Sequence, residues 1–370
     1  MPLPACCPCP ANAVVPRQGG VALITVLLIV FLASLTATSL ATLQQIAIRR
    51  STVLQHQQQA RLYALGLEQW AKLILIRDGQ KNQTDHPDEE WAHLPPALPV
   101  EGGRLSAKIR DLQGCFNLNN LWRPALVGSP DDPDDNLEIS ANSDEEPEEN
   151  PDDSSADQSN ALASRDRNRP PSAKAGLDQA QLQTLQRLLT LLELKPELAQ
   201  AIADWVDPDP DPLFPDGAED SDYTILNPPY LAGNQPVISI SELRLIKGMD
   251  QETYNKLAPL VCALPPGTAL NINTAPAEVL AALSDGLEPA EMERLLQDRP
   301  TDGYENVDEF LNAAKITLNA ELKSLLSVSS QYFLLRADAR VGDGHAFLSS
   351  VIVRDDQGAR ILRRSFGYQD

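Results

Sequence analysis

Carboxylates alternate with prolines near the middle of the chain, and they form the group with the clearest chemical potential. The candidate ligands in residues 204–223 are Asp204, Asp207, Asp209, Asp211, Glu219, Asp220 and Asp222. Because the prolines stiffen the loop, these side chains cannot all point apart, and their mutual repulsion favours a bound cation. Calcium accepts about six to eight oxygen ligands in flexible geometry, so the spacing suits either a calcium site or a solvated acidic loop. The loop is not an EF-hand, because the glycine and the final glutamate of that motif are missing.

The sequence holds no grouping typical of catalysis. The four histidines are scattered at His56, His86, His93 and His345, and no Ser-His-Asp or Cys-His arrangement is present. We therefore expect a protein that is not an enzyme. A helix-glycine-helix pattern near residues 238–264 is also found in DNA-binding helix-hairpin-helix modules, but the net charge of −22 argues against a nucleic-acid partner.

Helical segments flank the acidic loop. Leucines recur at helical spacing over 177–194, and a second helix is predicted over 196–206 with a proline in its first turn. A capped helix that ends in a glycine is predicted over 238–249. The polar pair Asn273-Thr274 before Ala275-Pro276 predicts a further helix start. The loop is therefore expected to lie within a helical module.

Strand patterns lie on both sides of this module. Apolar and polar residues alternate over 104–115, and three more strand-like runs follow over 332–341, 345–354 and 360–366. Short turns with glycine and aspartate separate the last three runs, which is typical of a hairpin meander. The four runs together predict a small antiparallel sheet.

A long helix is predicted over 21–77, since no proline interrupts the chain before Pro87. Its first part is apolar, and at 1.5 Å per residue about twenty such residues cross a hydrocarbon core of about 30 Å. A short leader ending at Gly20 precedes it and lacks the cleavage site of an ordinary secretory signal. A plain signal anchor is the alternative. Arg17 precedes the apolar stretch and Arg49 follows it, so positive charge alone does not fix the orientation.

Several motifs together resemble the K-type minor pseudopilins of type II secretion. The leader resembles the class III leader of pilins, and Thr25 is neutral where most pilins carry a glutamate, a substitution known in the K type. Residues 111–121 have the pattern Asp-x-x-Gly-x-Phe-Asn-x-Asn-x-Leu, which is similar to a signature of this family, and whose asparagines suit tight turns and capping. Residues 204–223 resemble the family's Asp-Trp-x-Asp…Gly-Ala-Glu-Asp-x-x-Tyr stretch, and residues 271–276 its Asn-x-Asn-Thr-Ala-Pro run.

The resemblance implies an α+β fold: a pilin-like N-terminal transmembrane and stem helix packed on a small antiparallel sheet, with a large inserted SAM-like helical domain. The expected segments are a leader over 1–20, a transmembrane segment over 21–43, the stem and first part of the pilin-like domain over 44–127, a disordered acidic insert over 128–175, an α-helical calcium-binding domain over 176–327 and C-terminal strands over 328–370. The insert is expected to be disordered because it is acidic, rich in proline and serine, and free of aromatic residues.

The resemblance also implies a function. Prepilin peptidase would cleave between Gly20 and Val21, and the new amine would be methylated. The protein would sit in the inner membrane with a cytoplasmic N-terminus and a periplasmic body. It would form the tip of the pseudopilus with the minor pseudopilins of types I and J above the major pseudopilin, and support export of folded proteins. A periplasmic calcium-binding adaptor that never enters a filament is the alternative.

The implied sites concern calcium and cysteine. The resemblance places one or two calcium ions at Asp207, Asp209, Asp211, Glu219, Asp220 and Asp222, while Asp204 could be a ligand or cap a helix end. Cys115 and Cys262 are the only cysteines outside the leader, and in an oxidising compartment they would form a disulfide. Two buried free thiols are the alternative.

Overall fold

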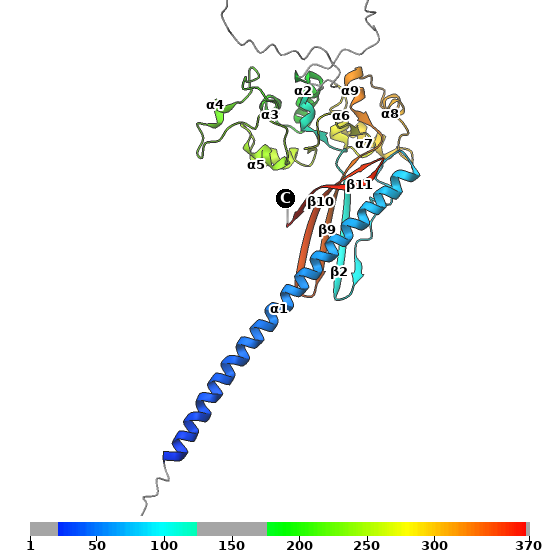
Figure 1. The fold of residues 1–370 in the computed structure, drawn as a ribbon. Coiled ribbons are helices and arrows are strands. Elements are labelled where there is room, and N and C mark those ends of the chain that lie inside the picture. Colours follow the sequence, from blue (N-terminus) through cyan, green and yellow to red (C-terminus); the bar gives the residue numbers. More distant parts are fainter. Residues whose placement is uncertain (1–20, 124–175, 368–370) are drawn as a thin grey trace, which may run out of the picture.

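The computed structural model describes residues 21–123 and 176–367. The predicted leader, with Gly20, and the predicted acidic insert over 128–175 lie outside these ranges. Within them the chain forms a long helix, a sheet at its far half and a helical domain beyond the sheet (Figure 1).

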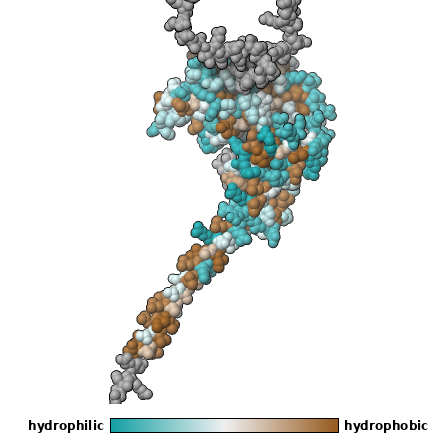
Figure 2. All heavy atoms as spheres, viewed as in Figure 1, coloured by the Kyte–Doolittle hydropathy of each residue, from teal (hydrophilic) through white to brown (hydrophobic). Residues whose placement is uncertain are grey.

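The stem is one helix, α1 (Val21–Lys81). The N-terminal half of this helix is apolar and exposed (Figure 2), and among the described residues α1 is the one helix long and apolar enough to span a membrane. The helix extends to Lys81, beyond the predicted end near Arg77, because no helix-breaking residue occurs before Pro87. In the second half, Ala60, Ala64 and Ala71 are fully buried, and their small side chains bring the helix close to the sheet.

The sheet is five-stranded and antiparallel in the order β1-β2-β9-β10-β11. The strands are β1 (Leu98–Val100), β2 (Gly103–Asp111), β9 (Tyr332–Val341), β10 (Gly344–Asp355) and β11 (Gly358–Phe366). The four predicted strands are confirmed, and only the short edge strand β1 was not predicted. One face of the sheet packs on α1, where Phe333 and Leu335 of β9 and Leu348 and Ile352 of β10 are fully buried.

The helical domain occupies the chain between β2 and β9. Its helices are η1 (Leu118–Leu121), α2 (Gln179–Leu191), α3 (Leu198–Val206), α4 (Asp220–Tyr223), η2 (Ile240–Leu245), α5 (Gln251–Leu257), α6 (Ala277–Ala281), α7 (Pro289–Gln297), α8 (Val307–Ala314) and α9 (Ala320–Ser324). Short two-residue strands tie it together: β3 (Phe116–Asn117) with β6 (Val261–Cys262), β4 (Trp122–Arg123) with β5 (Gly176–Leu177), and β7 (Leu270–Asn271) with β8 (Leu326–Ser327). The fold class predicted from the sequence is confirmed.

Two local predictions in this domain were wrong. The segment expected to be a capped helix over 238–249 contains only a 3₁₀ helix, η2, although Ser239 and Glu242 do form a capping box at its start. Helix α6 has Pro276 as its N-cap residue, not the polar pair before it. The side chain of Asn273 instead accepts from the backbone N–H of Tyr304 at 2.8 Å. The side-chain oxygen that was predicted to cap the helix therefore makes a long-range contact.

Candidate metal centre

The acidic loop begins where α3 ends, and the carboxylate of Asp204 binds the backbone of its later residues. Asp204 is fully buried in the last turn of α3. Its carboxylate accepts from the backbone N–H groups of Leu213 at 3.2 Å and Ala218 at 2.7 Å. Gly217 is required here, because a Cβ at this position would lie 2.2 Å from an oxygen of Asp204. The carboxylate of Asp204 therefore holds the loop in shape through backbone hydrogen bonds.

Asp207 and Glu219 are buried carboxylates without a basic partner, although this loop does not hold the described group of three carboxylates whose oxygens lie within 4.8 Å of one another. Both are nearly fully buried; one oxygen of Asp207 has no hydrogen-bond partner, and the oxygens of Glu219 have only the Asn234 side chain and the backbone of the α4 capping box close by. Burial and the charges of Asp209 and Asp204 raise the pKa of Asp207 to about 8. Burial and the charges of Asp204 and Asp220 raise the pKa of Glu219 to about 7. Within the part of the chain that the structure describes, no lysine or arginine pairs with either of them.

The remaining predicted ligands differ in which groups of the protein they contact. Asp209 lies close enough to raise the pKa values of Asp204, Asp207 and Glu219, whereas Asp211 is exposed. Asp220 accepts from the backbone N–H of Ala232 at 2.8 Å. Asp222 pairs with Lys247 at 2.8 Å.

Calcium at this loop stays a prediction that rests on the charge and burial of its carboxylates. Orphaned buried carboxylate oxygens carry a large desolvation cost that an opposing charge relieves, and a hard cation that accepts several oxygen ligands supplies that charge. Asp207, Glu219 and Asp209 would hold the ion. Asp204, Asp220 and Asp222 are engaged by the protein itself.

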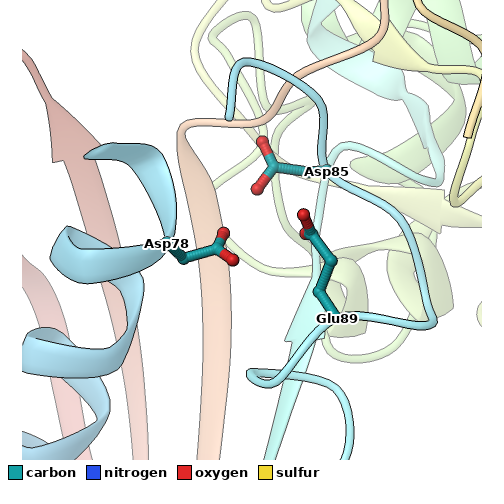
Figure 3. Close-up of side chains that lie close together, drawn as sticks. All are labelled: Asp78, Asp85 and Glu89. Carbon is teal, nitrogen blue, oxygen red and sulfur yellow. The ribbon is translucent and has the colours of Figure 1, made fainter. Parts of the chain in front are cut away.

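A second acidic cluster, which the sequence did not indicate, lies where the stem helix ends. Asp78 belongs to α1, and Asp85 and Glu89 belong to the loop that follows it (Figure 3). All three are buried, and one oxygen from each lies within 4.8 Å of the others. By geometry this cluster could bind a metal. Burial and the neighbouring Glu89 and Asp85 raise the pKa of Asp78 to about 7.

This second cluster already contains a cation, the guanidinium of Arg354 on β10. Arg354 donates to Asp78 at 3.0 Å and to both oxygens of Asp85 at 2.6 and 2.5 Å. Glu89 accepts from the Trp91 indole at 2.6 Å. No sequence motif indicates the cluster, because Arg354 is more than 260 residues from both aspartates along the chain.

A buried polar network connects the sheet to the helical domain through Asp111, the first residue of the signature. Its carboxylate accepts from Asn271 at 3.0 Å, Thr274 at 2.5 Å and Ser330 at 2.6 Å. Burial raises the pKa of Asp111 to about 6. The signature is therefore structural at this end, as its residue types suggested.

The asparagines of the signature hold the first turn of the helical domain. Asn117 caps η1 by accepting from the N–H of Asn119. The Asn119 side chain exchanges hydrogen bonds with the backbone of Val237, at 2.7 and 2.9 Å, and donates to the carbonyl of Leu264 at 2.8 Å. The predicted turn-forming and capping role is confirmed.

Cys115 and Cys262 are brought together in the same buried cluster, with the Cys262 Sγ 3.3 Å from the Cys115 carbonyl oxygen. Both are free thiols in this structure, which differs from the predicted disulfide and agrees with the alternative. Their contact arises because β3 pairs with β6 and sets Asn117 opposite Cys262.

Comparisons with known proteins identify relatives over most of the chain. Family models for type II secretion system (T2SS), protein K, match residues 114–266 and 270–329. Type II secretion system protein K of Pseudomonas aeruginosa is 32% identical, over 95% of this chain and 93% of that protein. The protein of the same name from Aeromonas hydrophila is 33% identical, over 94% of this chain and 96% of its own length.

A solved structure gives the same assignment. A chain in the crystal structure of the GspK-GspI-GspJ complex from the type 2 secretion system of enterotoxigenic Escherichia coli is 30% identical, with a TM-score of 0.65. The match covers 86% of the present chain and 100% of that chain. The long apolar N-terminal helix is consistent with a single-pass membrane anchor in such a system. On sequence and structure alike, the chain belongs to the type II secretion system protein K family.

Proposed function

We propose that the chain is the minor pseudopilin at the tip of a type II secretion pseudopilus. The observation that carries this proposal is the match to protein K over nearly the whole chain. Thr25 adds to it. Its hydroxyl donates to the carbonyl of Ala22 at 2.9 Å within α1, so this position needs no partner charge from a subunit above it.

The proposed partners are the minor pseudopilins of types I and J, and below them the major pseudopilin. The protein K relative of known structure was solved in a complex with GspI and GspJ, which supports the first two. The stem would anchor in the inner membrane with a cytoplasmic N-terminus and a periplasmic body. In this position the chain would support export of folded proteins as a structural component.

Calcium is the proposed ligand of the acidic loop. Asp207 and Glu219, with Asp209, would bind the ion, and the bound ion would supply the positive charge that their buried oxygens lack. The loop joins α3 to η2, so the ion would stabilise that part of the helical domain. Its role would be to keep the tip folded.

Processing at the N-terminus tests the filament proposal against the alternative of a free periplasmic adaptor. We expect prepilin peptidase to cleave after Gly20 and leave a methylated Val21, which the mass of the N-terminal peptide of the membrane-purified protein would reveal. Gly20→Leu should leave the chain uncleaved because the peptidase admits only a small side chain, whereas Gly20→Ala should be cleaved. A mature-sized band for Gly20→Leu in cells with an intact peptidase would contradict the proposal.

The redox state of the two cysteines tests whether the body of the protein lies in an oxidising compartment. We propose that Cys115 and Cys262 form a disulfide in the periplasm, since the fold brings them into contact across a sequence separation of 147 residues. Such a bond would stabilise the fold by about 4 kcal/mol through chain entropy. Unfolded, unreduced protein should then resist alkylation, while Cys262→Ser should expose one reactive thiol. Two alkylated thiols in the wild type would show that the bond does not form.

A further inference from the structure

A groove runs between the outer face of the sheet and the overhanging helical domain. Its floor includes Leu334 of β9 and Val351 of β10, on the face away from the stem, and its opposite wall includes Ile240 of η2 and Tyr254 of α5. The cavity volume is about 970 Å³. Figure 2 shows the outline of the molecule hollowed below this overhang.

The charge of the groove is opposite to that of the protein. Four arginines line it, at Arg110, Arg244, Arg336 and Arg363, and none of the aspartates and glutamates that the structure describes does. The chain as a whole has 52 acidic residues and a net charge of −22. A concentration of positive charge in a cleft attracts negatively charged groups and raises their local concentration.

The contacts of these arginines within the described chain leave their charge without an acidic partner. Arg363 donates to the carbonyl of Ile238 at 2.8 Å, and Arg244 lies over the ring of Tyr254 at 4.2 Å. Arg110 has only a weak contact of 3.9 Å with the Cys115 sulfur. Over residues 21–123 and 176–367, none of the four forms an ion pair with a carboxylate, unlike Arg354 and Arg364, which pair with Asp85 and Glu68.

The groove also offers apolar surface and an open strand edge. Ile238 and Leu362, both lining residues, are 66% and 51% exposed. β11 is the last strand of the sheet, so within the described chain the backbone groups on its outer side have no strand partner. Such an edge accepts an added strand from another polypeptide.

We infer that this groove binds an extended acidic segment of a partner polypeptide, in which carboxylates alternate with aliphatic side chains. The carboxylates would pair with Arg110 and Arg336, and the aliphatic side chains would cover Ile238 and Leu362. A polypeptide is favoured over an anionic membrane or a nucleic acid, because the acidic protein around the groove repels an extended anionic surface. The inference does not depend on the chain's position in a filament.

Binding of a model peptide to the full-length protein in detergent tests this inference. The probe is a short fluorescein-labelled peptide of alternating glutamate and leucine, and the same peptide with glutamine in place of glutamate is its neutral counterpart. We expect anisotropy to report binding of the acidic peptide only, weakened by salt. The double variant Arg110→Gln/Arg336→Gln should reduce the affinity by about tenfold, because two exposed charges that attract the peptide are lost.

The matched control is Arg340→Gln, which removes an outward-facing charge from the same strand but outside the groove. It should leave peptide affinity within about twofold of the wild type. Equal affinity for the neutral peptide, or equal losses in the control and the double variant, would overturn the inference. Vesicles of anionic phospholipid that displace the peptide, and bind less well to the double variant, would assign the groove to lipid.

Two deletions test whether the occupant comes from the chain itself. Removal of residues 128–175 or of residues 368–370 should leave peptide affinity unchanged if the groove serves a partner. A rise of about tenfold in either deletion would assign the groove to that segment and overturn the inference of a partner.

Discussion

The two acidic sites of this protein both bury several carboxylates, but they differ in how the negative charge is compensated. At the end of the stem, Asp78 and Asp85 are buried against the guanidinium of Arg354, and Glu89 is buried beside them. In the helical domain, Asp207 and Glu219 are buried without a basic partner among the described residues. A cluster whose cation is part of the chain is complete when the chain folds. A cluster that lacks one depends on an ion from solution.

This difference assigns the two sites different roles. Arg354 links β10 to α1 and to the loop after it, so the cluster at the end of the stem fixes the stem against the sheet. The acidic loop belongs to the helical domain, and we expect its order to depend on calcium. The pilin-like part should therefore be stable in any ionic condition, and the helical domain should not.

The largest effect is expected from Arg354→Met. This substitution leaves the buried Asp78 and Asp85 without their ion-pair partner and should destabilise the protein by about 3–5 kcal/mol, measured by chemical denaturation. Arg360→Met removes an exposed arginine 3.8 Å from Asp355 and should cost less than about 1 kcal/mol. If calcium restored the stability of the Arg354 variant, the cluster would accept a metal, and the contrast between the two sites would fail.

Calcium should have the next largest effect. At a hundredfold excess over Kd it should stabilise the protein by about 2.7 kcal/mol, seen as a higher melting temperature in calcium than in chelator. The double variant Asp207→Ala/Asp209→Ala should lose this response, and secretion in cells should fail through a disordered tip. Asp211→Ala, at the exposed position of the same loop, should keep the response. Equal wild-type melting temperatures in calcium and chelator would mean that the loop is only a solvated surface.

For a single group and a single pH unit, the pH dependence of stability should be the smallest of the three effects. The pKa values of Asp207 and Glu219 are raised to about 8 and 7 from 3.8 and 4.5. In chelator the folded state therefore takes up protons between pH 8 and pH 6 that the unfolded state does not bind. The free energy of unfolding should rise as pH falls through this range, by at most about 1.4 kcal/mol per pH unit for each proton taken up.

Two comparisons sharpen this pH prediction. Calcium competes with these protons, so it should flatten the slope and leave the part due to Asp78, whose pKa is about 7 beside Arg354. The variant Asp207→Asn/Glu219→Gln should show the same reduced slope in chelator. Stability that falls between pH 8 and pH 6 in chelator would contradict the assignment of these groups as buried and uncompensated.

Local patterns in the sequence determined the elements and the family. The apolar run after Gly20 predicted the stem, and alternation over 104–115 and 332–366 predicted four of the five strands, because hydrophobic period directly reflects which face is buried. The prediction of a type II secretion protein K is confirmed by relatives over most of the chain. The boundaries of the predicted domains, the disulfide and the calcium ligands remain predictions.

Only the tertiary structure decided which charged groups meet. The sequence indicated six carboxylates in the acidic loop as ligands and Asp204 as either a ligand or a cap; in the fold Asp204 accepts backbone hydrogen bonds, and Asp207 and Glu219 are buried without a basic partner. The Arg354 cluster and the arginine-lined groove gave no signal in the sequence. Their residues come from strands and loops far apart in the chain, and a contact of that kind depends on how elements pack, which local periodicity does not encode.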